Sequence, residues 1–324
     1  MFIDELTIRV CSGSGGKGCE SYRKRPDHKR IPNGGDGGNG GNVILIADLH
    51  TGNLAALKSK RIFEAENGGA GMGNHRHGRN GKDCVVSLPC GTTVYSRRDG
   101  LLIRDLTTPG EEVVVVCGGK GGHGNHKGRR STPGEASKEL ELSVSFKIMA
   151  DIFLVGLPNS GKTLLLKKLT GAHIQETDYP FATKSPQLGT YETDEHVFRI
   201  CELPSIGESS ASGGGLGTHY LKHLERARLM FFLVDLEPRF ASDLQDGFDV
   251  LIRTVDQFNS ELRNLPYFLV VNKVDLVDKN RLERKRFSKD GRTFWISARK
   301  GTGVEALMKA AREVLVPHHF KVRP

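Results

Sequence analysis

Residues 156–163 read GLPNSGKT, and this stretch decides the fold of the half of the chain in which it lies. It matches the pattern G-x-x-x-x-G-K-[ST], it follows an apolar run at 152–155, and it opens a helical pattern at 163–169. A glycine-rich turn between a strand and a helix directs backbone N–H groups toward phosphate oxygens. We expect Lys162 to contact the β- and γ-phosphates of a nucleotide and the Thr163 hydroxyl to bind Mg²⁺. The sequence therefore predicts a P-loop.

The residues around this loop predict the rest of the fold and of the phosphate site. The expected phosphate-binding residues are Gly156, Pro158, Asn159, Ser160, Gly161, Lys162 and Thr163. Beyond the loop, apolar strand-like runs alternate with longer helical patterns. The expected strands are 152–155, 197–202, 230–235, 267–272 and 293–297, and the expected helices are 163–169, 219–227, 244–259 and 304–314. This alternation predicts a doubly wound α/β sheet.

The base of the nucleotide is predicted by residues 272–275, which read NKVD and follow the strand at 267–271. The Asp275 carboxylate can accept hydrogen bonds from the ring N–H and the exocyclic amine of guanine, a pattern that adenine lacks. Read alone, the tetrapeptide could be an ordinary turn, but after a P-loop it predicts a GTP or GDP site. The further base-binding residues that we expect are Asn272 and Lys273, with Ser297 and Ala298 offering backbone N–H groups to the guanine carbonyl.

The first half of the chain has a different composition, because 27 of the 40 glycines lie in residues 1–150. Composition alone also permits disorder in its glycine clusters. However, GGDGGNGG at 34–41 approaches a three-residue period, which fits polyproline II chains packed through residues without side chains. Strand-like runs flank the clusters at 2–10, 43–47, 85–88, 92–95, 113–117 and 140–144.

The net charge and the spacing of the cysteines indicate the kind of partner and the cellular compartment that we expect. The chain carries 47 Lys and Arg against 38 Asp and Glu, which suits a polyanionic partner such as RNA or a membrane surface. The densest basic segment is Arg23, Lys24 and Arg25 with Lys29 and Arg30. The six cysteines lack C-x-x-C spacing and no apolar leader precedes Asp4, so we expect reduced thiols in the cytoplasm. No apolar run approaches the about 20 residues that span a bilayer.

Several motifs together resemble those of the Obg family of GTPases over nearly the whole chain. They are MFID at 1–4, GGDGGNGG at 34–41, HGRN at 77–80, GGKGGHGN at 118–125, DYPF at 178–181 and the segment 217–226. The resemblance implies a mixed fold: a glycine-rich domain of polyproline II chains on a small β-barrel at 1–149, then an α/β Ras-like GTPase domain at 150–324, without the further carboxy-terminal domain that many members carry. It also implies association with the large ribosomal subunit and its rRNA during assembly, and we expect a monomer.

The resemblance also implies roles for single residues in the GTPase half. Thr183, next to Phe181 and Ala182 in the nucleotide-binding set, corresponds to the switch threonine that completes the Mg²⁺ shell. Asn159 corresponds to an asparagine associated with K⁺-assisted hydrolysis, although a loop-capping role is an alternative. The expected catalytic residues are Lys162, Thr183 and Asn159, and the expected metal ligands are Thr163 and Thr183.

The largest departure from the family pattern Asp-x-Pro-Gly is Glu202-Leu203-Pro204-Ser205, four residues that we also expect at the nucleotide. Glu202 keeps the negative charge on a longer side chain, and Ser205 keeps the N–H group but disfavours positive φ. Ile206 stands where many relatives of Ras carry a water-orienting glutamine, which predicts slow hydrolysis. Two interpretations follow: a GTP-hydrolysing switch, which we favour, or a guanine-nucleotide-binding assembly module with negligible hydrolysis. A sensor of guanosine alarmones is a third.

Overall fold

The structure is a computed structural model that describes residues 2–26, 29–126, 128–171, 184–206, 219–236, 241, 243–276 and 292–316. The chain divides into two compact units, residues 1–147 and residues 148–324. The domain limits predicted from the sequence differ from this division by two residues.

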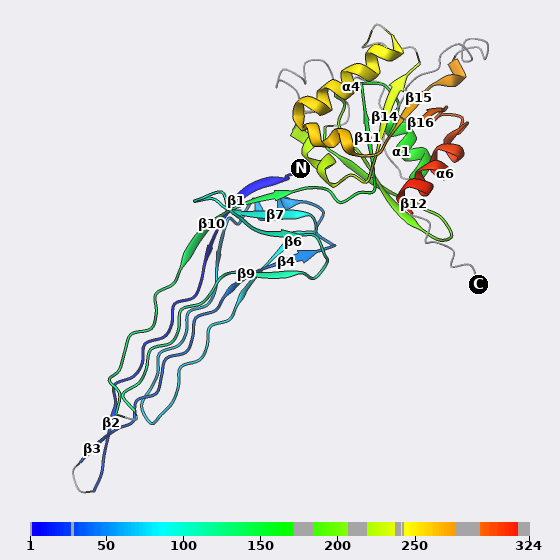
Figure 1. Cartoon of the computed structure of the whole chain (residues 1–324). Helices are drawn as coiled ribbons and strands as arrows, with labels where there is room; N and C mark the ends of the chain where they lie inside the picture. Colours follow the sequence, from blue (N-terminus) through cyan, green and yellow to red (C-terminus); the bar gives the residue numbers. More distant parts are fainter. Residues whose placement is uncertain are drawn as a thin grey trace, which may run out of the picture. The chain divides into compact units, whose positions relative to one another are not determined.

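The first unit contains two small sheets (Figure 1). One has the order β5 (Ile62–Glu64), β1 (Glu5–Cys11), β10 (Glu139–Phe146), β7 (Thr92–Ser96), β8 (Leu102–Leu106), and the other has the order β6 (Cys84–Pro89), β4 (Val43–Asp48), β9 (Glu112–Val116). Alternate side chains of the central strands are buried, as in β1 at Ile8 and Val10. The hydrogen bonds thus form two sheets, where the resemblance implied one small barrel. A short hairpin, β2 (Tyr22–Lys24) with β3 (Arg30–Pro32), and the 3₁₀ helix η1 (Leu54–Leu57) complete the unit.

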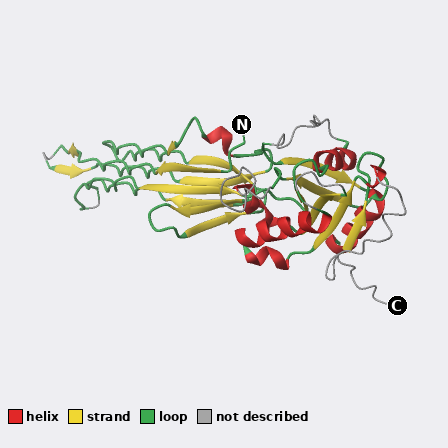
Figure 2. Cartoon of the chain, turned by 90° about the horizontal axis from the view of Figure 1, so that it is seen from above, coloured by secondary structure: helices red, strands yellow, loops and turns green. Residues whose placement is uncertain are grey.

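Between these strands, glycine-rich segments run side by side without regular strand or helix hydrogen bonding (Figures 1 and 2). A Cβ atom added to a glycine of the 34–41 run would collide with the backbone of a neighbouring segment. At Gly34, Gly37 and Gly40 it would lie 1.9–2.0 Å from the carbonyl oxygens of Cys19, Gly16 and Gly13. At Gly35, Gly38 and Gly41 it would lie 2.0–2.1 Å from those of Arg76, Arg79 and Lys82. Because these contacts recur every three residues, the polyproline II prediction is confirmed.

The third residue of each triplet links the segments through its side chain. The backbone N–H groups of Asp36, Asn39 and Asn42 donate to the side chains of His77, Asn80 and Asp83 at 3.1, 2.8 and 2.6 Å. Their own side-chain oxygens accept from the N–H groups of Gly124, Gly121 and Gly118 at 2.7, 2.9 and 2.9 Å. We call these contacts the triplet ladder. Each triplet is therefore fixed to two neighbours, one running parallel to it and one antiparallel.

The second unit is built on a six-stranded sheet. Its order is β12 (Gln187–Glu192), β13 (Val197–Glu202), β11 (Ile152–Gly156), β14 (Leu229–Asp235), β15 (Tyr267–Asn272), β16 (Arg292–Trp295), and only the pairing of β12 with β13 is antiparallel. The helices whose bounds the structure describes are α1 (Lys162–Thr170), α4 (Leu244–Phe258) and α6 (Val304–Leu315), with 3₁₀ helices η2 (Leu221–Arg226), η3 (Ser260–Asn264) and η4 (Val274–Leu276).

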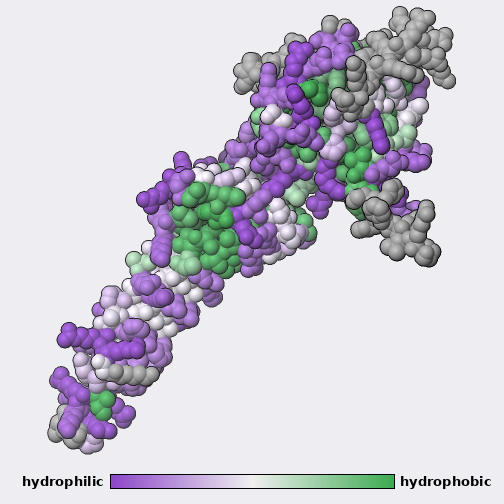
Figure 3. Space-filling model, in the orientation of Figure 1, coloured by the Kyte–Doolittle hydropathy of each residue, from purple (hydrophilic) through white to green (hydrophobic). Residues whose placement is uncertain are grey.

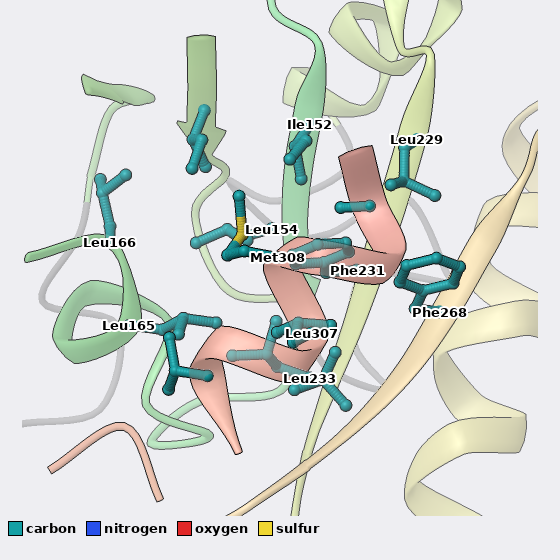
Figure 4. Packing of buried hydrophobic residues seen from close by; sticks show 14 of the residues in the cluster. Ile152, Leu154, Leu165, Leu166, Leu229, Phe231, Leu233, Phe268, Leu307 and Met308 are labelled. Atoms are coloured by element: carbon teal, nitrogen blue, oxygen red, sulfur yellow. The ribbon is translucent and has the colours of Figure 1, made fainter. Parts of the chain in front are cut away.

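Helices cover both faces of this sheet. Phe231 and other β11 and β14 side chains pack with residues of α1 and α6 in one buried cluster (Figure 4). The adjacent residue Phe232 faces the opposite way, since its ring contacts Phe248 of α4 with ring centroids 6.0 Å apart. The predicted doubly wound sheet is thus confirmed. The segment predicted as a helix at 219–227 is helical, but only residues 219 and 220 are α-helical. The rest forms the short 3₁₀ helix η2, and the N–H group of Ala227 closes it by bonding to the carbonyl of Leu224.

The surface of the first unit carries a hydrophobic area (Figure 3). On the sheet β6-β4-β9, the paired strands expose Val85 by 57% and Val114 by 49%. Among the residues that the structure describes, no helix is both long and apolar enough to cross a membrane.

Candidate functional site

The predicted P-loop lies between the end of β11 at Gly156 and the start of α1 at Lys162. Asn159 and Gly161 have left-handed backbone conformations, with φ of 61° and 88°. A Cβ atom on Gly161 would lie 2.2 Å from the Asn272 Nδ2 atom, and one on Gly156 would lie 2.5 Å from the Leu233 carbonyl oxygen. Both glycines are therefore needed for the loop to fold over the end of the sheet.

The Lys162 side chain turns back into this loop. Its Nζ atom donates to the carbonyl oxygens of Gly156 at 3.0 Å and Leu157 at 2.9 Å, and to the Ser205 Oγ atom at 2.9 Å. The residue is only 4% exposed. Burial lowers the pKa of Lys162 to about 8, although the negative charge of Glu202 raises it in part. The ammonium group is therefore protonated at neutral pH and lies where a phosphate would meet the loop.

Thr163 and Glu202 bring two oxygen donors together beside the lysine. The Thr163 hydroxyl donates to Glu202 Oε1 at 2.7 Å, and Glu202, the last residue of β13, is 1% exposed. A hydroxyl and a carboxylate are the hard oxygen ligands that Mg²⁺ prefers, so this donor set fits the ion. The longer side chain of Glu202 thus still reaches the threonine that the sequence predicts as a metal ligand.

The segment after Glu202 runs along the end of β11. The N–H group of Leu203 donates to the Leu154 carbonyl at 3.1 Å, and that of Ile206 donates to the Gly156 carbonyl at 3.2 Å. These bonds hold Ser205 against the P-loop. Ser205 is not among the non-glycine residues with positive φ, so the replacement of glycine produces no backbone strain in this conformation.

Asn272 connects the phosphate loop to the predicted base-binding loops. Its Nδ2 atom donates to the Ser160 carbonyl at 2.9 Å, and its Oδ1 atom accepts from the Ala298 N–H group at 3.0 Å. The Ser297 N–H group donates to the Thr302 carbonyl at 3.0 Å. Both N–H groups expected to meet the guanine carbonyl are thus engaged within the protein. The contact of these N–H groups with the guanine carbonyl stays a prediction. It requires that the Ala298 N–H group shares or gives up its hydrogen bond to Asn272.

The Asp275 carboxylate is prepared to accept hydrogen bonds. The Ser297 hydroxyl, and to a lesser extent the positive charges of Lys300 and Arg299, lower its pKa, against a burial contribution that raises it. An ionised carboxylate is acceptor-only, as recognition of the guanine edge requires. Lys273 has a left-handed backbone, φ 67°, and its ammonium group pairs with Asp235 at the end of β14. Sequence reasoning missed Asp235, although a carboxylate that ends a buried strand was the available signal.

The structure thus gathers most of the predicted residues at one edge of the sheet. Glycine 156, Glu202 and Asn272 each end a parallel strand, and the carboxyl ends of such strands are where ligands bind in open α/β folds. The predicted residues Phe181, Ala182 and Thr183 lie outside the described residues. Within the described ranges, no group of three or more His, Cys, Asp or Glu side chains is placed to hold a metal ion. This combination of sheet, P-loop and NKVD segment defines a P-loop GTPase.

Comparisons with known proteins assign the chain to a family. A family model described as GTP1/OBG matches residues 3–147, and one described as a 50S ribosome-binding GTPase matches residues 151–273. The GTPase Obg of Persephonella marina is 36% identical over 328 residues, which cover 97% of this chain and 96% of that protein. The GTPase Obg of Chlorobium phaeobacteroides is 38% identical over 316 residues, which cover 94% of this chain and 96% of that protein. The chain belongs to the Obg family and is a GTPase.

Proposed function

We propose that this GTPase is a nucleotide-controlled switch that associates with the large ribosomal subunit during its assembly. The observation that carries the proposal is the β2–β3 hairpin, on which five basic side chains are exposed: Arg23, Lys24, Arg25, Lys29 and Arg30. Such a cluster suits rRNA phosphates, to which binding is salt-dependent and largely independent of sequence. The description of the matching family model, a 50S ribosome-binding GTPase, supports this partner.

In this proposal the nucleotide site works through residues of the sheet edge. Lys162 and the P-loop N–H groups bind the phosphates, and Asp275 selects guanine. Thr163 and Thr183 hold Mg²⁺, which supplies positive charge to the phosphate oxygens when it is bound. The contact between Thr163 and Glu202 and the unstrained backbone of Ser205 support hydrolysis over the alternative of a module that only binds nucleotide.

Single-turnover GTP hydrolysis tests the switch. We expect the unsubstituted chain to release phosphate slowly. The rate should be higher in K⁺ than in Na⁺, and Asn159→Ala should remove this difference. The double variant Glu202→Asp, Ser205→Gly restores the family pattern and serves as the reference. Hydrolysis by the double variant alone, while both proteins bind GTP and GDP, would show that the natural chain binds nucleotide without switching.

Co-sedimentation with large ribosomal subunits at several salt concentrations tests the partner. Reversal of the five hairpin charges to Glu should weaken association and reduce its salt dependence. A matched control reverses five exposed basic residues of the same unit outside the hairpin: Lys58, Lys60, Arg61, Arg97 and Arg98. Equal co-sedimentation of the hairpin variant and the unsubstituted chain would remove the hairpin from the interface.

A further inference from the structure

The three hydrogen bonds of Lys162 use its full capacity as a donor. An ammonium group has three N–H donors, and here they bond to the carbonyls of Gly156 and Leu157 and to the hydroxyl of Ser205. The two carbonyls belong to the P-loop itself, whereas Ser205 lies 43 residues away in the chain. A glycine at position 205, as in the pattern Asp-x-Pro-Gly, offers no such acceptor.

We propose that the Ser205 hydroxyl competes with the γ-phosphate for Lys162 and thereby shifts the preference of the site from GTP toward GDP. The inference rests on the proposed function, because it takes guanine nucleotide at this P-loop as its starting point. It assigns to the Ser205 side chain a role in the choice between GDP and GTP. The reduced backbone freedom of serine relative to glycine does not by itself provide this role.

The competition follows from the number of donors. A P-loop lysine contacts the β- and γ-phosphates, so GDP takes one donor of Lys162 and GTP takes two. With GDP bound, one donor goes to the β-phosphate, one to a loop carbonyl, and the third stays on Ser205. With GTP bound, the γ-phosphate takes a second donor, which in this proposal is the one that bonds to Ser205.

Ser205 is also held in place for this role. The N–H group of the next residue, Ile206, donates to the Gly156 carbonyl at 3.2 Å, so the segment cannot move away without breaking this bond. Glu202, three residues earlier, is fixed by the Thr163 hydroxyl at 2.7 Å. The hydroxyl therefore faces Lys162 from a segment anchored on both sides.

The test compares the affinities for GDP and for a non-hydrolysable GTP analogue by isothermal titration calorimetry, on the full chain at one Mg²⁺ concentration. In Ser205→Ala we expect the ratio of GTP affinity to GDP affinity to rise about tenfold, the low end for a hydrogen bond to a charged group. Ser205→Gly should behave in the same way, and Ser205→Thr, which keeps the hydroxyl, should keep the original ratio. Ser297→Ala is the control on the base side, where both affinities should fall together.

The outcomes separate this inference from the proposal on which it rests. An unchanged ratio in both Ser205→Ala and Ser205→Gly, with both nucleotides bound, overturns the inference alone. A rise of the ratio in Ser205→Thr equal to that in Ser205→Ala also overturns it, because the hydroxyl would then not be the cause. Failure of the unsubstituted chain to bind either nucleotide overturns both.

Discussion

Substitution of Gly37 by alanine should unfold the packing of the glycine-rich segments. The added Cβ atom would lie 1.9 Å from the Gly16 carbonyl oxygen, whereas ordinary contacts begin at 3.4 Å, so backbone must move by about 1.5 Å. The Gly16 and Gly37 N–H groups each hold a 2.8 Å hydrogen bond to another segment, to the carbonyls of Gly38 and Gly122. Overpacking costs ~1–3 kcal/mol and a broken buried hydrogen bond ~1–3 kcal/mol. We expect a loss of about 4 kcal/mol.

Hydrogen exchange on the full chain measures this loss where it occurs. Peptides covering 34–42 and 118–124 should exchange about 10³-fold faster in Gly37→Ala, since about 1.4 kcal/mol corresponds to tenfold. Trp295, the only tryptophan, lies in β16 and reports separately on the second unit. Gly52→Ala is the matched control, because no atom lies within 4 Å of its added Cβ. Equal exchange in the two variants would refute the packing argument.

Three further predictions concern other contacts. Asp275→Ala should lower GTP and GDP affinity at least about 100-fold by removing two charge-assisted hydrogen bonds, measured by calorimetry, with ATP binding unaffected. Asn272→Ala leaves the Ser160 carbonyl and the Ala298 N–H group without their buried partner, so urea unfolding followed by Trp295 fluorescence should show a loss of about 2–4 kcal/mol, and an unchanged unfolding midpoint would contradict this role of Asn272. Burial raises the pKa of Asp36, but the Gly124 N–H group and the imidazoles of His126, His77 and His123 lower it overall, below 3.8. Its stabilisation should therefore be present above pH 3.8 and be lost as pH falls through the lowered pKa, which hydrogen exchange of 118–124 would detect and Asp36→Asn should flatten.

The strands of the second unit could be predicted because central parallel strands are buried on both faces and read as continuous apolar runs. Strand β12 was missed, since it is an edge strand whose sequence, QLGTYE, alternates exposed and partly buried residues. The pattern at 219–227 predicted a helix. Apolar residues three positions apart share a face in a 3₁₀ helix and also in an α-helix, so the pattern could not distinguish the two. The hairpin β2–β3 was hidden by its charged, exposed residues.

The candidate site was predicted as far as its motifs are local in sequence. The loop at 156–163 and the segment at 272–275 each carry their chemistry within eight residues or fewer. The bond from Lys162 to Ser205 and the pair of Lys273 with Asp235 depend on which strands become neighbours, so they emerge only from the folded sheet. The same holds for Asn272, whose role in joining two loops is invisible in the tetrapeptide that contains it.

The triplet ladder limits how the length of the first unit can change. The partners of Asp36, Asn39 and Asn42 on the parallel segment all lie 41 residues further along the chain. Deletion of one residue within 34–42 would shift the register, so that side chains would occupy glycine positions, where only a hydrogen atom fits. Deletion of a whole triplet would keep the register but would leave the two neighbouring segments one triplet longer than this one. The segments can therefore lengthen or shorten only by matched triplets, each adding about 9 Å of reach at about 3.1 Å per residue.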